Sequence, residues 1–209
     1  MIEPPGFRGA IFGEAADGDP RTNHAVRSHF SERFGTPDRW SWVNQVHGGT
    51  VLAVDEPGSA GDGDGLATGS AGLAVGVATA DCVPVIIEGA GTTVVVHAGW
   101  RGMAAGVVDA GVAAVRVGGD TPIRAAIGPS IGPCCYEVGT EVLAVLDPYV
   151  ATTTWGTSSV DLWTAAEAQL GGMQVWRADV CTFTDARFLS HRRDRTTERQ
   201  VSVAWLSAS

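Results

Sequence analysis

Three runs of apolar, largely β-branched residues lie close together near the middle of the chain, and they constrain its fold most strongly. They are LAVGVA (73–78), VPVIIE (83–88) and TTVVVH (92–97). Runs of this length and composition predict buried strands. Residues 103–117 follow with helical spacing on a face of small residues, which predicts a helix packed closely on the sheet,. Together these patterns predict an α+β or mixed α/β fold.

Capping residues predict further helices. Asp19 followed by Pro20 is expected to start a helix that ends at Gly35,. Thr140 and Asp161 are expected to cap two later helices. The remaining predicted elements are helices 141–147 and 162–170 and strands 122–128, 173–178 and 200–206. No repeat or linker interrupts the chain, so we expect one domain over residues 1–209.

The region between residues 40 and 72 is predicted to contain a pair of strands and a long loop. Strands 40–46 and 50–56 are expected to pair, and the glycine-rich residues 56–72 are expected to form the loop,. Asp62 and Asp64 suggest calcium, but their spacing lacks the distal glutamate of an EF-hand loop,. We therefore expect both aspartates to lie in a solvated loop.

The charge of the chain argues against several classes of partner. The formal net charge is −9, and arginines gather only in a short patch at 192–199. Binding to nucleic-acid phosphates requires a basic face, so this class is disfavoured. The first residues lack the pattern of a signal peptide, and no apolar stretch is long enough to span a membrane,. We expect a cytoplasmic protein without nucleic-acid or membrane partners.

Four cysteines are present, and in a reducing compartment we expect them to be thiols,. Cys134 and Cys135 are adjacent and poorly placed to form a disulfide with each other. Together with Cys181 they are expected to act as small buried apolar residues. Cys82 is treated separately because of its position at a strand end.

His47, Cys82 and His97 each lie at or beside the end of an apolar strand, where sites on sheet proteins tend to form,. Two imidazoles and a thiolate are ligands that zinc accepts, and three protein ligands leave a position for water or substrate. Two alternatives stay open from the residues alone. The three side chains have unconnected packing roles, or Cys82 is a nucleophile with His47 or His97 as its base.

The same two histidines and cysteine are similar to a blue-copper centre, for which Met103 is the nearest axial candidate,. A multicopper oxidase needs several copper centres built mostly from imidazoles. The chain has five histidines, which are too few for such a set. Copper is therefore the less favoured metal.

Groups that can hold an anion accompany these three residues. Arg101 lies in a glycine-rich turn that leads into a helix, whose free amides favour phosphate or carboxylate,. Ser190, Arg192 and Arg193 form a second candidate anion or ribose site. The structural alternatives are an ordinary surface arginine for the first and a solvated loop for the second.

Seven motifs follow one another along the chain: NQVHG (44–48), DGLAT (64–68), TADCVPV (79–85), HAGWRG (97–102), IGPSIGPCCYEVG (127–139), CTF (181–183) and SHRRD (190–194). In this order they resemble the motifs of the laccase-domain family, also called polyphenol oxidoreductase-like or purine nucleoside phosphorylase-like. The resemblance covers about residues 40–206 and implies a single mixed α/β domain similar to cytotoxic-necrotizing-factor-type cysteine hydrolases.

The resemblance also implies a function. It suggests a zinc ion on His47, Cys82 and His97, and phosphorolysis of adenosine, inosine, guanosine and methylthioadenosine to free base and pentose 1-phosphate, with adenosine deamination as a second activity. Asp81 is expected to orient a ligand histidine or to act as an acid on the purine, with a turn cap as its structural alternative. Gln45 is a candidate substrate-binding residue because it lies in the NQVHG motif.

Arg101, with Arg192 or Arg193, is expected to share the negative charge of phosphate. Three other functions are weighed against this one. The first is a cytoplasmic amidase of the peptidoglycan-editing type, which cleaves a muropeptide precursor. The second is a copper-dependent polyphenol oxidoreductase. The third, a non-catalytic metal-bound partner protein, is disfavoured because three ligands leave zinc open.

Overall fold

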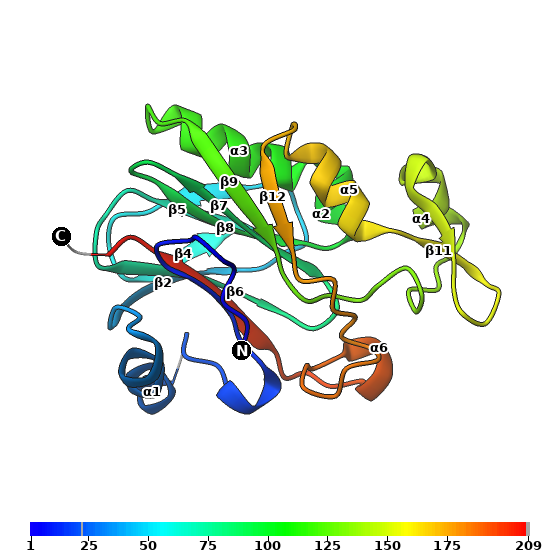
Figure 1. Ribbon diagram of the computed structural model, residues 1–209, viewed down its shortest axis with the longest axis horizontal. Coiled ribbons are helices and arrows are strands. Elements are labelled where there is room, and N and C mark those ends of the chain that lie inside the picture. Colours follow the sequence, from blue (N-terminus) through cyan, green and yellow to red (C-terminus); the bar gives the residue numbers. More distant parts are fainter. Residues whose placement is uncertain (22, 208–209) are drawn as a thin grey trace.

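Two β-sheets pack face to face, with helices on both outer faces (Figure 1). The computed structural model describes residues 1–21 and 23–207. One outer face is covered by helix α1 (His24–Phe34), and the other by α2 (Trp100–Ala104), α3 (Val107–Val117) and α5 (Leu162–Gln169). The arrangement confirms the predicted mixed α+β class.

The first sheet has five strands, which include the first and the last strand of the chain. Strand β2 runs parallel to both of its neighbours, while the strands on the other side pair antiparallel. In spatial order its strands are β1 (Ala10–Phe12), β13 (Gln200–Trp205), β6 (Leu73–Thr79), β2 (Arg39–Asn44) and β4 (Gly58–Asp62).

The second sheet has six strands and carries two of the three apolar runs. Its central strands pair antiparallel, and parallel pairs lie at both edges. In spatial order the strands are β12 (Gln174–Arg177), β9 (Pro122–Ile127), β7 (Val83–Gly89), β8 (Thr93–Ala98), β5 (Gly65–Thr68) and β3 (Val51–Ala53).

The apolar runs are uninterrupted because strands β6, β7 and β8 are buried on both faces. In β8, Val95 packs into the core between the sheets, whereas Val94 and Val96 pack beneath the helices. In β6, Val75 and Val77 face the second sheet, and the opposite face of this strand packs toward α1. A strand with one solvated face would show alternating polar residues instead.

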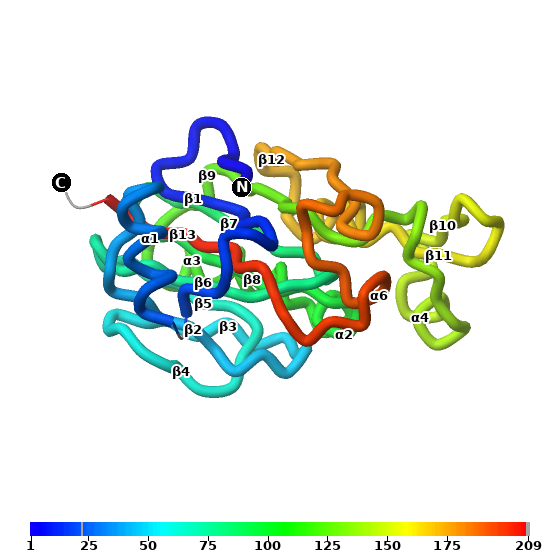
Figure 2. Tube along the Cα trace, turned by 90° about the horizontal axis from the view of Figure 1, so that it is seen from below, coloured from blue at the N-terminus to red at the C-terminus, as the bar shows by residue number. Residues whose placement is uncertain are grey.

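The remaining elements extend from one end of the sandwich. Figure 2 shows α4, β10 and β11 well apart from α1 at the opposite end of the molecule. These elements are α4 (Thr140–Val145), the ribbon β10 (Val150–Thr152) and β11 (Ser158–Val160), α6 (His191–Asp194) and the 3-10 turn Asp147–Tyr149. Another 3-10 turn, Ala15–Asp17, lies beside α1, where Asp17 pairs with Arg33. Within the described residues, no helix is both long and apolar enough to cross a membrane.

The structure corrects two of the expected helix starts. Helix α1 begins after Asn23, whose side chain accepts from two backbone amides, while Asp19 instead binds the Arg21 guanidinium. Thr140 is the first residue of α4 rather than its cap. Asp161 does cap α5, accepting from the amides of Trp163 and Thr164, as expected.

The helix expected over residues 103–117 is divided into α2 and α3. The chain at Gly106 takes a positive φ of 72°, a conformation that glycine adopts at little cost,. Helix α2 therefore ends at Ala104, and α3 begins at Val107.

The region between residues 40 and 72 differs most from expectation. Strands β2 and β3 do not pair, because they belong to different sheets. The residues expected to form one long loop contain β4 and β5, which also belong to different sheets. The chain therefore crosses between the sheets three times from β2 to β5, after β2, after β3 and after β4.

Candidate metal centre

Three crossings of the chain between the two sheets each contribute a residue to one site. His47 follows β2, Asp64 follows β4, and Cys82 follows β6, and in each case the next strand lies in the other sheet. His97 joins them from β8, shortly before α2. The fold therefore gathers residues that are distant in sequence at one end of the sandwich.

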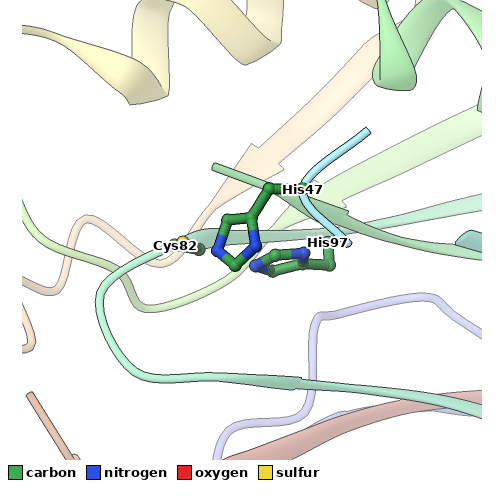
Figure 3. Close-up of side chains that lie close together, drawn as sticks. All are labelled: His47, Cys82 and His97. Carbon is green, nitrogen blue, oxygen red and sulfur yellow. The ribbon is translucent and has the colours of Figure 1, made fainter. Parts of the chain in front are cut away.

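His47, Cys82 and His97 point toward one another (Figure 3). One ligand atom of each lies within 4.8 Å of the others. Three atoms this close share a point within about 2.8 Å of them all, near the metal–ligand distances of zinc sites. The two imidazole rings lie nearly perpendicular, with centroids 4.7 Å apart. Small side-chain movements therefore suffice to bind one ion.

Asp64 holds two of these residues, His47 and His97, in place through hydrogen bonds. Its Oδ1 lies 2.8 Å from His97 Nδ1 and accepts from the His47 amide, and its Oδ2 accepts from the Gly48 amide. Asp64 is fully buried. Because Nδ1 of His97 is engaged by the carboxylate, Nε2 is the nitrogen available for a metal. This carboxylate–histidine pair is the arrangement that orients metal-binding histidines in many proteins.

The backbone at Gly99 passes very close to two of the ligand residues. A Cβ on Gly99 would lie 3.0 Å from Cys82 Sγ and 3.1 Å from His47 Cδ2. His47 has a positive φ of 58°, which is uncommon for a residue other than glycine,. Such strain concentrates at functional sites.

The charges of the metal-free site are strongly coupled. Burial alone would raise the pKa of Cys82, but the charge of His97 and hydrogen bonds with both histidines lower the pKa to about 6. Burial alone would lower the pKa of His97, but Cys82 and Asp64 raise it to about 9. Burial also opposes ionisation of Asp64, yet its three hydrogen bonds hold the pKa below its usual value. Cys82 and His97 therefore form a thiolate–imidazolium pair near neutral pH.

We expect Cys82 in metal-free protein to react with iodoacetamide at unusually low pH. Because the pKa is lowered, the thiolate fraction and the alkylation rate should rise as pH increases through about 6 and then level off,. An ordinary thiol would show this rise near pH 8.5. Peptide mass spectrometry against pH measures it, and Cys134, whose pKa is raised, is the internal control. A midpoint near 8.5 at Cys82 would contradict this electrostatic description.

Gly99→Ala is expected to weaken metal binding by displacing Cys82 or His47, since the added Cβ overlaps both. Gly91→Ala is the matched control, because no atom lies within 4 Å of a Cβ added there. Competition with a chromophoric chelator measures both affinities. Equal affinities for the two variants would show that the close approach at Gly99 is unimportant.

The three side chains open onto a cavity of about 480 Å³. The wall of this cavity also includes Arg21, Gln45, His191 and Arg199. A larger depression of about 650 Å³ between α3 and strands β3 and β5 contains none of these residues. The site chemistry therefore belongs to the smaller cavity, where a metal ligand set and positive charge meet.

Two of the other candidate residues are engaged by the surrounding chain. Gln45 lines the cavity, and its amide exchanges hydrogen bonds with the backbone of Ala78. Asp81 accepts from Thr182 Oγ1 and from the Arg192 amide, each at 2.7 Å. Asp64, and not Asp81, is thus the carboxylate that contacts a ligand histidine.

The expected anion-binding residues lie outside the residues that line the cavity. Arg101 stacks over Trp100 and lies 3.7 Å from Glu141. Arg192 donates to the Glu137 carbonyl.

Ser190 and Arg193 serve the local structure of the same segment. Ser190 is the N-cap of α6, and its side chain accepts from the Arg193 amide. The Arg193 guanidinium donates to backbone carbonyls, including those of Thr182 and Phe188. These two residues therefore hold the loop that precedes β13.

Sequence reasoning missed four residues of the site: Asp64, Arg21, His191 and Arg199. Asp64 carried one usable signal, because it opens the DGLAT motif immediately before β5. His191 and Arg199 lie in the same arginine-rich segment as Ser190, Arg192 and Arg193, the residues expected to bind the anion. Arg21 carried no signal, because its part of the chain was expected to be helical.

The donor set fits zinc. Two imidazoles and one thiolate, with a carboxylate behind one imidazole, match the ligands and outer partners of catalytic zinc sites. Met103, the axial candidate for copper, is buried in the core between the second sheet and its helices. The structure thus places Met103 as a packing residue.

Comparison with known proteins agrees with the fold and the motifs. Residues 6–207 match the family described as multi-copper polyphenol oxidoreductase laccase. A protein of Streptomyces coelicolor named purine nucleoside phosphorylase is 40% identical over 93% of this chain and 86% of its own length. A protein of the same name from Pseudomonas aeruginosa is 37% identical over 96% of this chain and 87% of its own.

Two solved structures share the fold. YlmD from Geobacillus stearothermophilus is 31% identical, with a TM-score of 0.80 over 100% of this chain and 89% of that one. The hypothetical protein YfiH of Bacillus licheniformis is 27% identical, with a TM-score of 0.80 over 97% and 87%. The relatives of this chain described above are named purine nucleoside phosphorylase. The chain therefore belongs to the laccase-like polyphenol oxidoreductase family.

Proposed function

We propose that this protein is a zinc-dependent purine nucleoside phosphorylase. The observation that carries the proposal is the convergence of His47, Cys82 and His97, within 4.8 Å of one another, on a cavity that also holds arginines. The names of the curated relatives supply the reaction class. We extend the proposal to adenosine, inosine, guanosine and methylthioadenosine as substrates, and to adenosine deamination as a second activity.

Zinc on these three residues would polarise an oxygen bound to it and lower the pKa of a bound water toward about 7. The residues of the chain prepare the site for it. Asp64 holds His97 with Nε2 toward the site, and its contacts with the His47 and Gly48 amides fix the turn that carries His47. Little rearrangement is then required when substrate arrives.

Phosphorolysis joins a phosphate oxygen to the anomeric carbon of the sugar while the bond from that carbon to the purine breaks. The purine leaves with the bonding electrons and takes up a proton. The protein must hold an anion beside a sugar that gains positive charge. Arg21, His191 and Arg199 supply cationic or protonatable groups on the wall of the cavity.

Arg199 is the best candidate to hold phosphate. Arg21 is already paired with Asp19 at 2.7 Å. Within the described residues, hydrogen bonds engage only the Nη1 of Arg199, which donates to the carbonyls of Thr196 and Glu198. The rest of its guanidinium can therefore bind an anion in the cavity.

We expect Arg199→Gln to raise the KM for phosphate about tenfold or more, since a hydrogen bond to a charged group contributes about 1.5–3 kcal/mol. The KM for nucleoside should change far less. Arg195→Gln is the matched control, because Arg195 is exposed and does not line the cavity. Initial rates against phosphate concentration measure the effect, and an equal change in both KM values would argue against a phosphate contact.

Products identify the reaction directly. Purified protein is incubated with adenosine, with and without phosphate, and the purines are separated by chromatography. Adenine that forms only with phosphate supports phosphorolysis, and inosine supports deamination. Absence of both products from zinc-loaded protein would overturn the proposal.

A second function is favoured by one observation, the lowered pKa of Cys82 beside His97. A thiolate and imidazolium pair is the nucleophile of cysteine hydrolases. The rival is therefore an amidase of the peptidoglycan-editing type, as the expected likeness to cytotoxic-necrotizing-factor-type hydrolases would suggest. It predicts amide cleavage of a muropeptide precursor without phosphate and without metal.

A further inference from the structure

A second group of sulfur atoms lies outside the candidate metal centre. Cys134, Cys135 and Cys181 each place a sulfur within 4.8 Å of the others, and the sulfurs of Cys134 and Cys135 are 3.3 Å apart. None of the three belongs to the His47, Cys82 and His97 set. These residues, named here the three-cysteine cluster, were expected only to pack as small apolar side chains.

Two loops bring the cluster together. One follows β9 and carries Cys134 and Cys135, and the other follows β12 and carries Cys181 (Figure 1). The loops run side by side, with a bridge between Ser130 and Cys181 and backbone hydrogen bonds from Ser130 to Val180 and from Thr182 to Ser130. The positions of the sulfurs are thus set by the backbone and not by long side chains.

The surroundings are those of a built site. Cys135 and Cys181 are buried, with 2% and 8% exposure, while Cys134 is half-buried. The Gly132 amide donates to Cys181 Sγ at 3.2 Å, a contact that favours the thiolate,. A Cβ on Gly132 would lie 2.8 Å from the Trp163 ring and 3.3 Å from Cys134 Sγ. Only glycine allows this close packing around the sulfurs.

We propose that Cys134, Cys135 and Cys181 form a second metal site, which binds a thiophilic cation such as Zn²⁺ or Cu⁺ through three sulfurs. Separations of at most 4.8 Å place a common point within about 2.8 Å of all three, close to a zinc–sulfur bond of about 2.3 Å,. A donor set of sulfur alone selects soft cations over Mg²⁺ or Ca²⁺. On binding, each coordinating thiol releases its proton to solvent.

Arg193 holds the segment that directly follows Cys181. The Arg193 guanidinium donates to the carbonyls of Thr182 and Phe183, the two residues that follow Cys181, at 2.7 and 3.1 Å. Thr182 also donates to Asp81, the neighbour of Cys82. An ion in the three-cysteine cluster would therefore stabilise the segment at Cys181 and Thr182, which contacts Asp81 beside the candidate metal centre.

The test is a titration of reduced, metal-free protein with Cd²⁺, followed by thiolate-to-metal absorption in the ultraviolet. Wild-type protein should bind two ions per chain. The ion in the three-cysteine cluster should absorb about three times as strongly as the other, because three thiolates replace one. Cys82→Ser should remove only the weakly absorbing ion, and Cys181→Ser only the strongly absorbing one.

Cys134→Ser tests the same site if the Cys181 variant does not fold. It should fold, because Cys134 is half-buried and serine is of similar size. It should reduce the strong absorption by about one third and weaken that site, while the Cys82 ion is retained. A single ion per chain, lost with Cys82→Ser and unaffected by Cys134→Ser, would overturn the proposal.

Competition then identifies the cation. Zn²⁺ or Cu⁺ should displace Cd²⁺ from the site that depends on Cys181, and whichever displaces it at lower free concentration is the preferred ion. Displacement by either ion supports the proposal. Failure of both to displace Cd²⁺, even when each is added in large excess, contradicts it, because a soft-cation site must accept at least one of them.

Discussion

Cys82→Ser is expected to reduce phosphorolysis more than about a hundredfold, because loss of a direct ligand should exceed the 10–100-fold cost of losing an outer partner. Cys82 Sγ is one of three ligand atoms that lie within 4.8 Å of each other. Serine has almost the same shape but is a far weaker zinc ligand at neutral pH, since its hydroxyl remains protonated. The zinc content should fall by one ion per chain.

The fold should survive this substitution, because Cys82 is half-buried and the replacement is nearly isosteric. Circular dichroism checks the fold, and elemental analysis after gel filtration measures zinc. His24→Gln is the matched control, because His24 is an exposed residue at the start of α1, away from the cavity lining. Full activity of Cys82→Ser, or an unchanged zinc content, would remove Cys82 from the proposed metal centre.

Asp64→Asn is expected to lower the zinc affinity by about 10–100-fold, the usual cost of losing an outer partner of a ligand histidine. Asp64 accepts from His97 Nδ1, from the His47 amide and from the Gly48 amide. Asparagine retains one acceptor oxygen and replaces the other with a donor. At least one of these contacts must therefore be lost inside a fully buried position.

The same substitution should destabilise the protein by about 1–3 kcal/mol, because a buried donor loses its partner. Asp62→Asn is the matched control, since Asp62 is exposed and contacts Asn44 at the surface. Its effect should stay within about 0.5 kcal/mol. Urea unfolding and chelator competition measure the two quantities. Equal behaviour of the two variants would show that Asp64 does not orient the site.

The buried strands could be predicted because their signal is local. Strand β8 reads as an unbroken apolar run in sequence, and the structure buries Val94, Val95 and Val96 completely. The ends of these strands also revealed His47, Cys82 and His97, which are polar or reactive residues next to apolar runs. The convergence of the three was supported in advance by the family resemblance, since their spacing in sequence carries little information.

Asp64 shows why the rest could not be predicted. Its neighbours are glycines and aspartates, which are typical of a solvated loop, and yet it is fully buried. The burial arises because the chain crosses from β4 to β5 between two sheets, a long-range arrangement that no local pattern encodes. The same reason explains Arg21 and Arg199, which come from opposite ends of the sequence to line one cavity.

The oxygen atoms of phosphate report most directly whether the protein is a phosphorylase. Zinc-loaded protein is given inosine and phosphate labelled with ¹⁸O, and the sugar product is analysed by mass spectrometry. Phosphorolysis yields a pentose 1-phosphate that retains every labelled oxygen, because a phosphate oxygen forms the new bond to the anomeric carbon. Free, unphosphorylated pentose with oxygen from solvent, or no release of the base, would contradict it.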